Sequence, residues 1–77
     1  MASGYVYESG GAQLARLRNA RSLTPYQCAR LLSLSVKTVY AWELGHAVPS
    51  LPQFAQLCLT FALTPEEILG IIDSYLQ

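Results

Sequence analysis

The sequence predicts a small all-α domain built from five helices, and three observations support this. Serine or threonine, the residue types that best cap a helix, stands at four points that each precede a run of helical spacing: Thr24, Ser35, Ser50 and Thr64. Apolar residues then recur every three or four positions, as they do along one face of a helix. With 77 residues, of which 52% are hydrophobic, the chain is long enough for one domain with one core.

The first helix is expected over about residues 12–21, where apolar residues share one face. Residues 1–11 contain three glycines and show no helical period. We therefore expect a flexible N-terminal tail there and the folded domain over residues 12–77. The residues expected on the inner face of this helix are Leu14, Leu17 and Ala20.

The second and third helices are short and have clear boundaries. The second starts at Thr24, because Pro25 suits the first helical position and Gln27 completes a capping box. The third follows Ser35 and ends at Gly45, since glycine readily adopts the left-handed conformation found at helix ends. The inner faces of the two helices are expected to carry Cys28, Ala29, Leu32, Val39 and Trp42.

Capping boxes also mark the last two helices, where Ser50 pairs with Gln53 and Thr64 with Glu67. Glu66 lies with Glu67 in a first helical turn, where acidic side chains meet the positive end of the helix dipole. The fourth helix is expected to face inward with Leu51, Phe54, Leu57, Cys58 and Phe61, and the fifth with Ile68, Leu69, Ile72, Tyr75 and Leu76, with Ile71 off that face.

The charges are few and unevenly distributed. Charged residues make up 13% of the chain, against about 25% in an average soluble domain, so exposed apolar patches are expected. All five basic residues precede Glu43, and residues 9–42 carry a charge of +5 with no acidic residue. This asymmetry indicates an anionic partner for the first half of the chain.

Several classes of function are excluded. No apolar run reaches the roughly 18 residues that span a bilayer, and the first residues lack the basic segment of a signal peptide. We therefore expect a cytoplasmic protein without a membrane partner. Cys28 and Cys58 have no second pair and no adjacent histidine, which argues against a metal site and favours buried, reduced thiols. No nucleophile stands with a base, so we expect neither an enzyme nor a cofactor.

A helix-turn-helix arrangement is indicated by the short connection between the second and third helices. Ser33, Leu34 and Ser35 alone separate them. Two short helices joined by so tight a turn are typical of the helix-turn-helix unit. A unit of this kind places its second helix in the major groove of DNA.

The order of residues around this turn strengthens the interpretation. The most specific elements are Trp42-Glu43 followed by Gly45, and then Pro49-Ser50-Leu51. With them the chain resembles the lambda-repressor-like family of Cro- and Xre-type regulators, over about residues 12–70 without a gap. The resemblance implies a compact five-helix domain that binds operator DNA, often as a dimer. It also implies a structural ion pair between Arg18 on the first helix and Glu43 at the end of the third.

By the same resemblance, the third helix, over about residues 36–44, is the one that enters the major groove. Lys37 would reach a guanine edge or a phosphate, and the carbon groups of Val36 and Ala41 would touch thymine methyl groups. The alternative is that these side chains are merely exposed on the helix. The residues expected to contact DNA are Val36, Lys37, Thr38, Tyr40, Ala41 and Arg16.

Some positions depart from the family's pattern in ways that weaken DNA binding. Pro25 stands where the family usually has a glutamine that grips a phosphate, and proline has neither a side-chain amide nor a backbone N–H to donate. Val36 and Leu44 stand where polar or basic residues are common, and Leu31 and Leu59 where lysine is common. Because phosphate contacts dominate affinity, a monomer with about two such contacts should bind weakly.

Apolar side chains outside the predicted core are candidates for protein contacts. Leu34 and Leu63, together with Leu31, Leu44 and Leu59, form an apolar surface or, for two or three of them, the edge of the core. The fifth helix is the first candidate for a homodimer contact. The residues expected in a protein interface are Leu31, Leu44, Leu59, Ile71 and Ile72.

Two functions remain open at this point. The first is a sequence-specific transcriptional repressor of the phage-repressor type, acting as a homodimer on double-stranded DNA. The alternative is an antirepressor-like modulator that docks the same fold on another transcriptional regulator through an apolar surface. Lys37 and Tyr40 favour the first function, whereas Pro25, Val36 and Leu44 favour the second.

Overall fold

The computed structural model describes residues 8–76, and these residues form five α-helices. The helices are α1 (Gly10–Ala20), α2 (Pro25–Leu32), α3 (Val36–Glu43), α4 (Leu51–Phe61) and α5 (Pro65–Tyr75). No strand occurs within residues 8–76, and the predicted all-α class is confirmed. Residues 1–7 of the predicted tail lie outside the described residues.

Every helix begins at a serine or threonine whose side chain accepts a hydrogen bond from the backbone N–H three residues later. The predicted capping boxes of α2, α4 and α5 are all present. Each cap contributes about 1 kcal/mol to stability. Gly45 has the predicted left-handed conformation, with a φ of 79°. The cap that was not predicted is Ser9, which starts α1 at Gly10, two residues before the expected start.

Two glycines at the start of α1 allow other helices to approach it closely. A Cβ atom on Gly11 would lie 2.5 Å from the carbonyl oxygens of Trp42 and Glu43, at the end of α3. A Cβ atom on Gly10 would lie 2.5 Å from the ring of Tyr75, at the end of α5. Both glycines are buried, so they belong to α1 and not to the tail predicted over residues 1–11.

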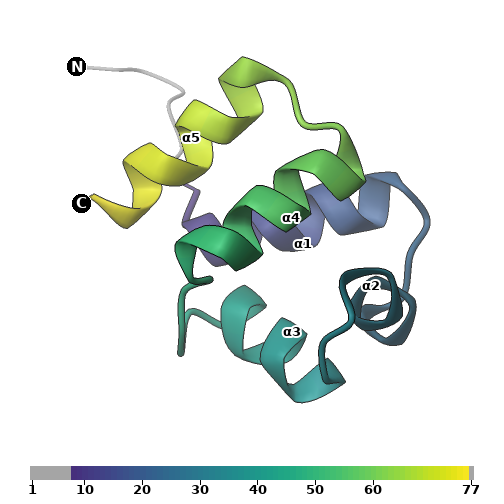
Figure 1. Cartoon of the computed structure of the whole chain (residues 1–77). Coiled ribbons are helices and arrows are strands. Elements are labelled where there is room, and N and C mark those ends of the chain that lie inside the picture. Colours follow the sequence, from purple (N-terminus) through teal and green to yellow (C-terminus); the bar gives the residue numbers. More distant parts are fainter. Residues whose placement is uncertain (1–7, 77) are drawn as a thin grey trace.

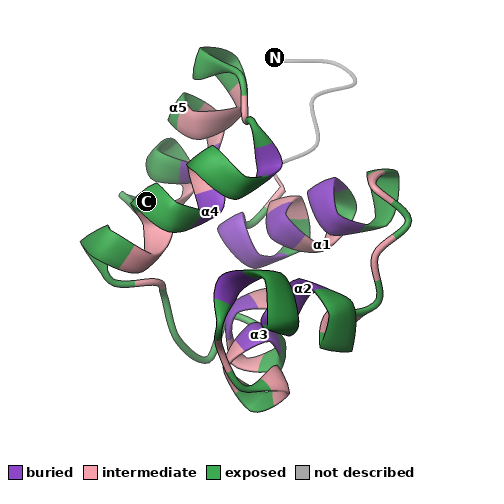
Figure 2. Cartoon of the chain, turned by 45° about the vertical axis from the view of Figure 1, so that its right-hand side comes forward, coloured by how far each residue is buried: buried purple, intermediate pink, exposed green. Residues whose placement is uncertain are grey.

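The five helices surround one core (Figure 1). α1 contacts both α3 and α5, and α2 contacts both α3 and α4. Figure 2 shows that the buried parts of the helices face one another, while the exposed parts lie on the outside. The buried apolar residues come from all five helices and are Leu14, Leu17, Cys28, Ala29, Leu32, Val39, Trp42, Leu57, Phe61 and Ile71.

The rotation of α5 differs from the predicted one. Ile71, predicted to lie off the inner face and in an interface, is completely buried, with 0% exposure. Gln13 explains this rotation, because its side-chain amide donates to the carbonyl oxygen of Gly70 and to Ser74 Oγ. With these bonds the Gly70 side of α5 lies against α1, and Ile71 next to it lies in the core. Because of this rotation, Leu69, Ile72 and Leu76 are exposed, although they were expected to face inward. Ala20 in α1 and Leu51 in α4 were also expected to face inward and are exposed.

The described helices contain neither a membrane span nor a metal site. None of the helices in residues 8–76 combines the length and the apolar character needed to cross a bilayer. Over the same range, no three side chains of His, Cys, Asp or Glu lie close enough together to hold a metal ion. Cys28 is buried and Cys58 is half-buried, and burial raises the pKa of both free thiols.

Candidate nucleic-acid interface

The turn between α2 and α3 sets the position of α3. Ser33 ends α2 in the left-handed conformation, with a φ of 56°. Its backbone N–H and that of Leu34 donate to carbonyl oxygens of α2. Leu34 packs against the core, and Ser35 caps α3 by accepting from the N–H of Thr38. A turn with its own hydrogen bonds and an apolar anchor leaves the start of α3 little freedom to shift.

A buried ion pair holds the other end of α3. Arg18 on α1 donates from Nε to Glu43 Oε2 at 2.6 Å and from Nη2 to Glu43 Oε1 at 3.0 Å. Its Nη1 also donates to the carbonyl oxygen of Leu23 at 2.7 Å, just before α2. The two side chains are only 11% and 12% exposed, and the hydrogen bonds to Glu43 raise the pKa of Arg18. Arg18 therefore joins three helices and is not available to DNA.

The outward side of α3 carries residues that were predicted to contact DNA. Since the inner side of α3 is buried in the core, helical periodicity turns Lys37, Tyr40 and Ala41 to the opposite side. Lys37 is exposed, Tyr40 is 42% exposed and Ala41 is half-buried. Leu44 follows on the same side and is 67% exposed. This face therefore offers one cation, one phenol and two apolar groups.

Val36 and Thr38 lie at the flanks of the same face. Val36 is half-buried and packs against the core, so only part of its side chain is open to a partner. The Thr38 hydroxyl is half-buried as well, and it shares a hydrogen bond of 3.1 Å with the Ser35 hydroxyl. Both side chains are thus less open than Lys37.

Arg16 lies away from α3. It precedes Arg18 by two residues, which is a rotation of about 200° around the helix. This rotation places Arg16 on the side of α1 opposite the contact with α3. There its Nη2 lies 3.0 Å from Glu8 Oε1, and the hydrogen bonds to Glu8 raise the pKa of Arg16. The structure therefore does not bring Arg16 together with the α3 residues that were predicted to bind DNA.

Few positive charges remain free to meet phosphates. Arg21 donates to two backbone carbonyl oxygens and lies over the Phe61 ring, 5.2 Å from its centroid. The two arginines described above are paired with carboxylates. Within residues 8–76, Arg30 and Lys37 are the basic side chains without a hydrogen bond or an ion pair. One copy of the chain therefore presents about two cations to a phosphate backbone.

Two exposed side chains of α2 extend the candidate surface. Tyr26 is 64% exposed and follows Pro25 directly at the start of α2. Arg30 comes four residues later, so the two share one side of the helix. Neither belongs to the set of residues predicted to contact DNA. Gln27 is exposed as well, and its amide oxygen accepts the N–H of Thr24 in the capping box.

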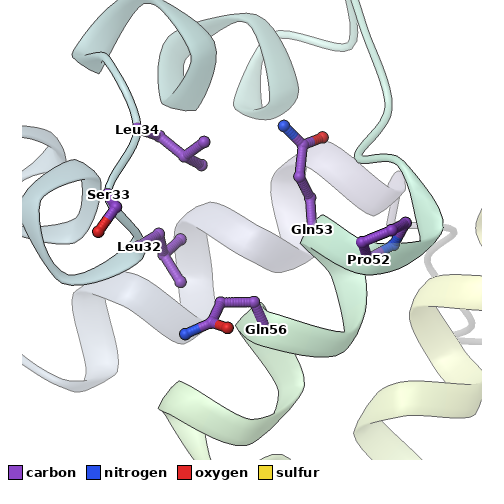
Figure 3. A pocket seen from close by; sticks show the side chains of 6 residues that line it. All are labelled: Leu32, Ser33, Leu34, Pro52, Gln53 and Gln56. Carbon is purple, nitrogen blue, oxygen red and sulfur yellow. The ribbon is translucent and has the colours of Figure 1, made fainter.

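A hollow of about 290 Å³ lies between the α2–α3 turn and the start of α4 (Figure 3). Its lining consists of Leu32, Ser33, Leu34, Pro52, Gln53 and Gln56. None of these side chains is charged, and none is a cysteine or a histidine. The hollow therefore lacks the acid, base and nucleophile pairs that a catalytic site needs.

The residues predicted for a protein interface separate into two groups. Leu31, Leu44, Leu59 and Ile72 are exposed, whereas Ile71 lies in the core and cannot contribute. Leu34 and Leu63 pack against the core, which agrees with the alternative prediction that two or three of these leucines form the edge of the core. The exposed side chains come from separate parts of the fold, so no single helix accounts for them.

A family model described as a helix-turn-helix domain matches residues 11–69. The match begins in α1, includes α2, α3 and α4, and ends within α5. No curated protein and no solved structure matches the sequence. The predicted resemblance is confirmed at the level of the family. The chain belongs to the Cro/Xre-like family of helix-turn-helix domains, which indicates a DNA-binding regulator.

Proposed function

We propose that the protein is a sequence-specific transcriptional regulator of the phage-repressor type, which reads DNA with α3 and acts by binding alone, without a catalytic step. The observation that supports this most directly is the way in which α3 is held. The α2–α3 turn fixes its start and the Arg18–Glu43 pair fixes its end, while Lys37 and Tyr40 stay exposed. Base recognition needs side chains on a rigid element, since small displacements break the contacts.

Each outward side chain of α3 has a role in this proposal. Lys37 donates to a guanine edge or to a phosphate, and the Ala41 methyl group meets a thymine methyl group. The hydroxyls of Tyr40 and Thr38 donate to phosphates, which position the helix without reading sequence. The open part of Val36 adds an apolar contact at the edge of the groove.

Phosphate binding by one copy is expected to be weak. Arg30 and Lys37 supply the free cations, and Tyr26 adds a hydroxyl at the start of α2, where proline stands in place of glutamine. The logarithm of affinity falls with the logarithm of salt concentration, with a slope of about −0.9 per neutralised phosphate. Two copies on a symmetric operator would neutralise about four phosphates and steepen the slope to about −3.6. The proposal therefore includes a homodimer on two half-sites.

Selection from a random-sequence pool of double-stranded DNA tests this function. The full chain is incubated with the pool at about 50 mM and 200 mM salt, and the retained DNA is sequenced. An enriched motif with two half-sites about one helical turn apart is expected. Absence of any enriched motif at the lower salt concentration would contradict the proposal.

A second candidate function is favoured by apolar side chains beside α3. Leu44, Val48 and Leu51 are 67%, 61% and 80% exposed along the connection to α4. Exposed apolar groups that lie together often mark protein contacts, so these residues favour an antirepressor-like modulator that docks on another transcriptional regulator. For such a modulator, Leu44→Asp would weaken docking more than Lys37→Glu. For a protein that reads DNA, Lys37→Glu would weaken DNA binding more than Leu44→Asp.

A further inference from the structure

A second hollow, of about 450 Å³, lies on the outer side of α2. Arg30 and Leu31 follow Gln27 by three and four residues, so these three lining side chains share one side of the helix. Leu23 completes the lining from the segment before Thr24, the cap of α2. None of the four lining residues is fully buried, so the hollow is open to a ligand from solvent.

The polar side chains of this hollow offer hydrogen-bond donors. Arg30 carries only N–H donors, and it has no hydrogen bond or ion pair within residues 8–76. The amide oxygen of Gln27 accepts the N–H of Thr24 at 2.8 Å, so the NH2 group of this amide remains for a ligand. The carbonyl oxygen of Leu23 already accepts from Arg18 at 2.7 Å. A ligand that matches the hollow therefore carries acceptor atoms.

The charge around the hollow favours an anion. From residue 9 to residue 42 the sequence contains no acidic residue, and Glu43 is bound to Arg18. The charge of Arg30 is therefore not neutralised by an acid on α1, α2 or α3. A guanidinium group binds a carboxylate through two parallel N–H···O bonds. A carboxylate thus matches Arg30 in both charge and shape.

Two leucines form the apolar part of the lining. Leu31 is 52% exposed, and Leu23 is half-buried. An apolar group that lies against them removes carbon surface from water, which is favourable in proportion to the area covered. The ligand that suits the whole hollow therefore combines one carboxylate with a compact apolar group, as aromatic and branched aliphatic acids do.

We propose that this hollow binds a small organic acid, in which one carboxylate is joined to an apolar group. The carboxylate meets Arg30 and the Gln27 amide, and the apolar group lies against Leu23 and Leu31. The volume of about 450 Å³ falls within the range of ligand pockets, which is about 300 to 1,000 Å³. Four lining residues are far fewer than the roughly 20 to 30 on each side of a protein interface, which favours a small molecule.

Binding of such an acid would oppose the binding of DNA. In the proposed function, Arg30 and Lys37 are the cations that one copy presents to phosphates. An acid on Arg30 leaves only Lys37 for this purpose, and the slope of affinity against salt should become shallower by about 0.9 for each copy. This consequence rests on the proposed function, whereas the binding of the acid is testable without DNA.

NMR titration of the isotope-labelled full chain with benzoate tests the site. Benzoate is added from about 0.1 to 30 mM at constant pH and ionic strength. The N–H signals of Gln27, Arg30 and Leu31 are expected to shift with a dissociation constant of about 1 mM, because a ligand of few atoms binds weakly. Acetate lacks the apolar group and benzamide lacks the charge, so each should bind at least tenfold more weakly. Equal binding of all three, or no shift with benzoate, overturns the proposal.

Arg30→Met and Lys37→Met are a matched pair of variants for the same titration. Both remove an exposed cation that has no partner within residues 8–76, but only Arg30 lines the hollow. Arg30→Met is expected to weaken benzoate binding at least tenfold, and Lys37→Met to change it by less than about twofold. Because both positions are exposed, both variants should fold, and their NMR spectra check this. Equal losses would mean attraction between charges without a site and would overturn the proposal.

A capped dipeptide distinguishes a small acid from a protein partner. Acetyl-leucyl-glutamate amide presents a carboxylate and an apolar group on a peptide chain. This chain loses more conformational freedom on binding than benzoate does, so the dipeptide is expected to bind at least threefold more weakly. Tighter binding of the dipeptide than of benzoate would assign the hollow to a protein partner and overturn the proposal.

This inference and the proposed function fail in different ways. A chain that selects an operator but does not bind benzoate retains the function and loses the acid site. A chain that binds benzoate but selects no DNA retains the site and loses the function. When both hold, saturating benzoate should lower operator affinity by the same factor as Arg30→Met, and it should have no further effect on that variant. Benzoate that binds without changing operator affinity would overturn the regulatory consequence.

Discussion

The first three helices and the last two are held together by different kinds of interaction. All five basic residues lie between the start of α1 and the end of α3, and three of them are bound to carboxylates or to backbone oxygens. α4 and α5 contain no basic residue of their own. They are held by apolar packing, by Arg21 at the Phe61 end of α4, and by the contact of Gln13 with Gly70 and Ser74.

This difference separates two kinds of surface. In the first half, the Arg18–Glu43 pair and Ser35 hold the two ends of α3, and Arg30 and Lys37 remain for an anionic partner. In the second half, the polar groups close helix ends, and large apolar side chains such as Leu59 and Leu69 stay outside. The proposed DNA contacts therefore fall in the first half and the largest exposed apolar side chains in the second, although both halves share one core.

The largest expected effect comes from breaking the buried ion pair of the first half. Glu43→Ala leaves Arg18 unpaired at 9% exposure, and we expect a loss of about 3 to 5 kcal/mol in the free energy of unfolding. Urea unfolding followed by circular dichroism measures this loss. Glu8→Ala, which breaks the exposed pair with Arg16, should cost less than about 1 kcal/mol. Equal losses in the two variants would show that the Arg18 pair has no special role.

Ile71 is the residue that tests the rotation of α5 in the second half. Because Ile71 is fully buried, Ile71→Ala is expected to cost about 2 to 5 kcal/mol in the free energy of unfolding. Ile72 is 39% exposed, so the same truncation there should cost clearly less. Thermal or urea unfolding of both variants checks this order. The reverse order would mean that the rotation of α5 described here is incorrect.

The direct contacts with DNA are expected to come from the first half. Lys37→Glu removes a free cation and adds a negative charge, so operator affinity should fall at least tenfold, or by about 1.4 kcal/mol. Arg16→Glu makes the same change in charge on the far side of α1 and should have a smaller effect. Fluorescence anisotropy with the selected operator, at two salt concentrations, measures both. A greater loss for Arg16→Glu would move the DNA surface away from α3.

The smallest expected effect concerns the reactivity of the two cysteines. Burial raises the pKa of both thiols, so less thiolate is present in the folded chain than in an unfolded one, and alkylation at pH 8 should be slowed. Cys28 is buried in α2 and Cys58 is half-buried in α4, so Cys28 should react more slowly. Both rates should rise with pH. Mass spectrometry of the alkylated chain over time gives the two rates, and faster labelling of Cys28 would mean that α2 opens more readily than α4.

Local chemistry made most helix starts predictable. The caps of α2, α3, α4 and α5 depend on residues that are neighbours in the sequence, and all four were predicted correctly. The predicted start of α1 was two residues too late, because Ser9 is followed by Gly10 and Gly11, which are poor helix formers. Their role depends on contacts with α3 and α5, which the local sequence does not contain.

The candidate sites were predictable where a large buried residue defines one side of a helix. Trp42 does this in α3, and the exposure of Lys37 and Tyr40 followed from it. In α5, four of the five residues from Ile68 to Ile72 are apolar, so periodicity alone did not identify the inner side. There the inner side depends on contacts with residues distant in the sequence, such as Gln13 and Gly10.

The close approach at Gly11 makes the tilt of α3 depend on a buried residue outside the proposed DNA contacts. The carbonyl oxygens of Trp42 and Glu43 rest against a position that has no side chain. A methyl group at this position would clash with the two carbonyl oxygens. Because these oxygens belong to the backbone of α3, the clash would push that end of the helix away from α1. If α3 reads DNA as proposed, substitutions in the first turn of α1 would change the preferred operator, while the side chains of α3 stayed the same.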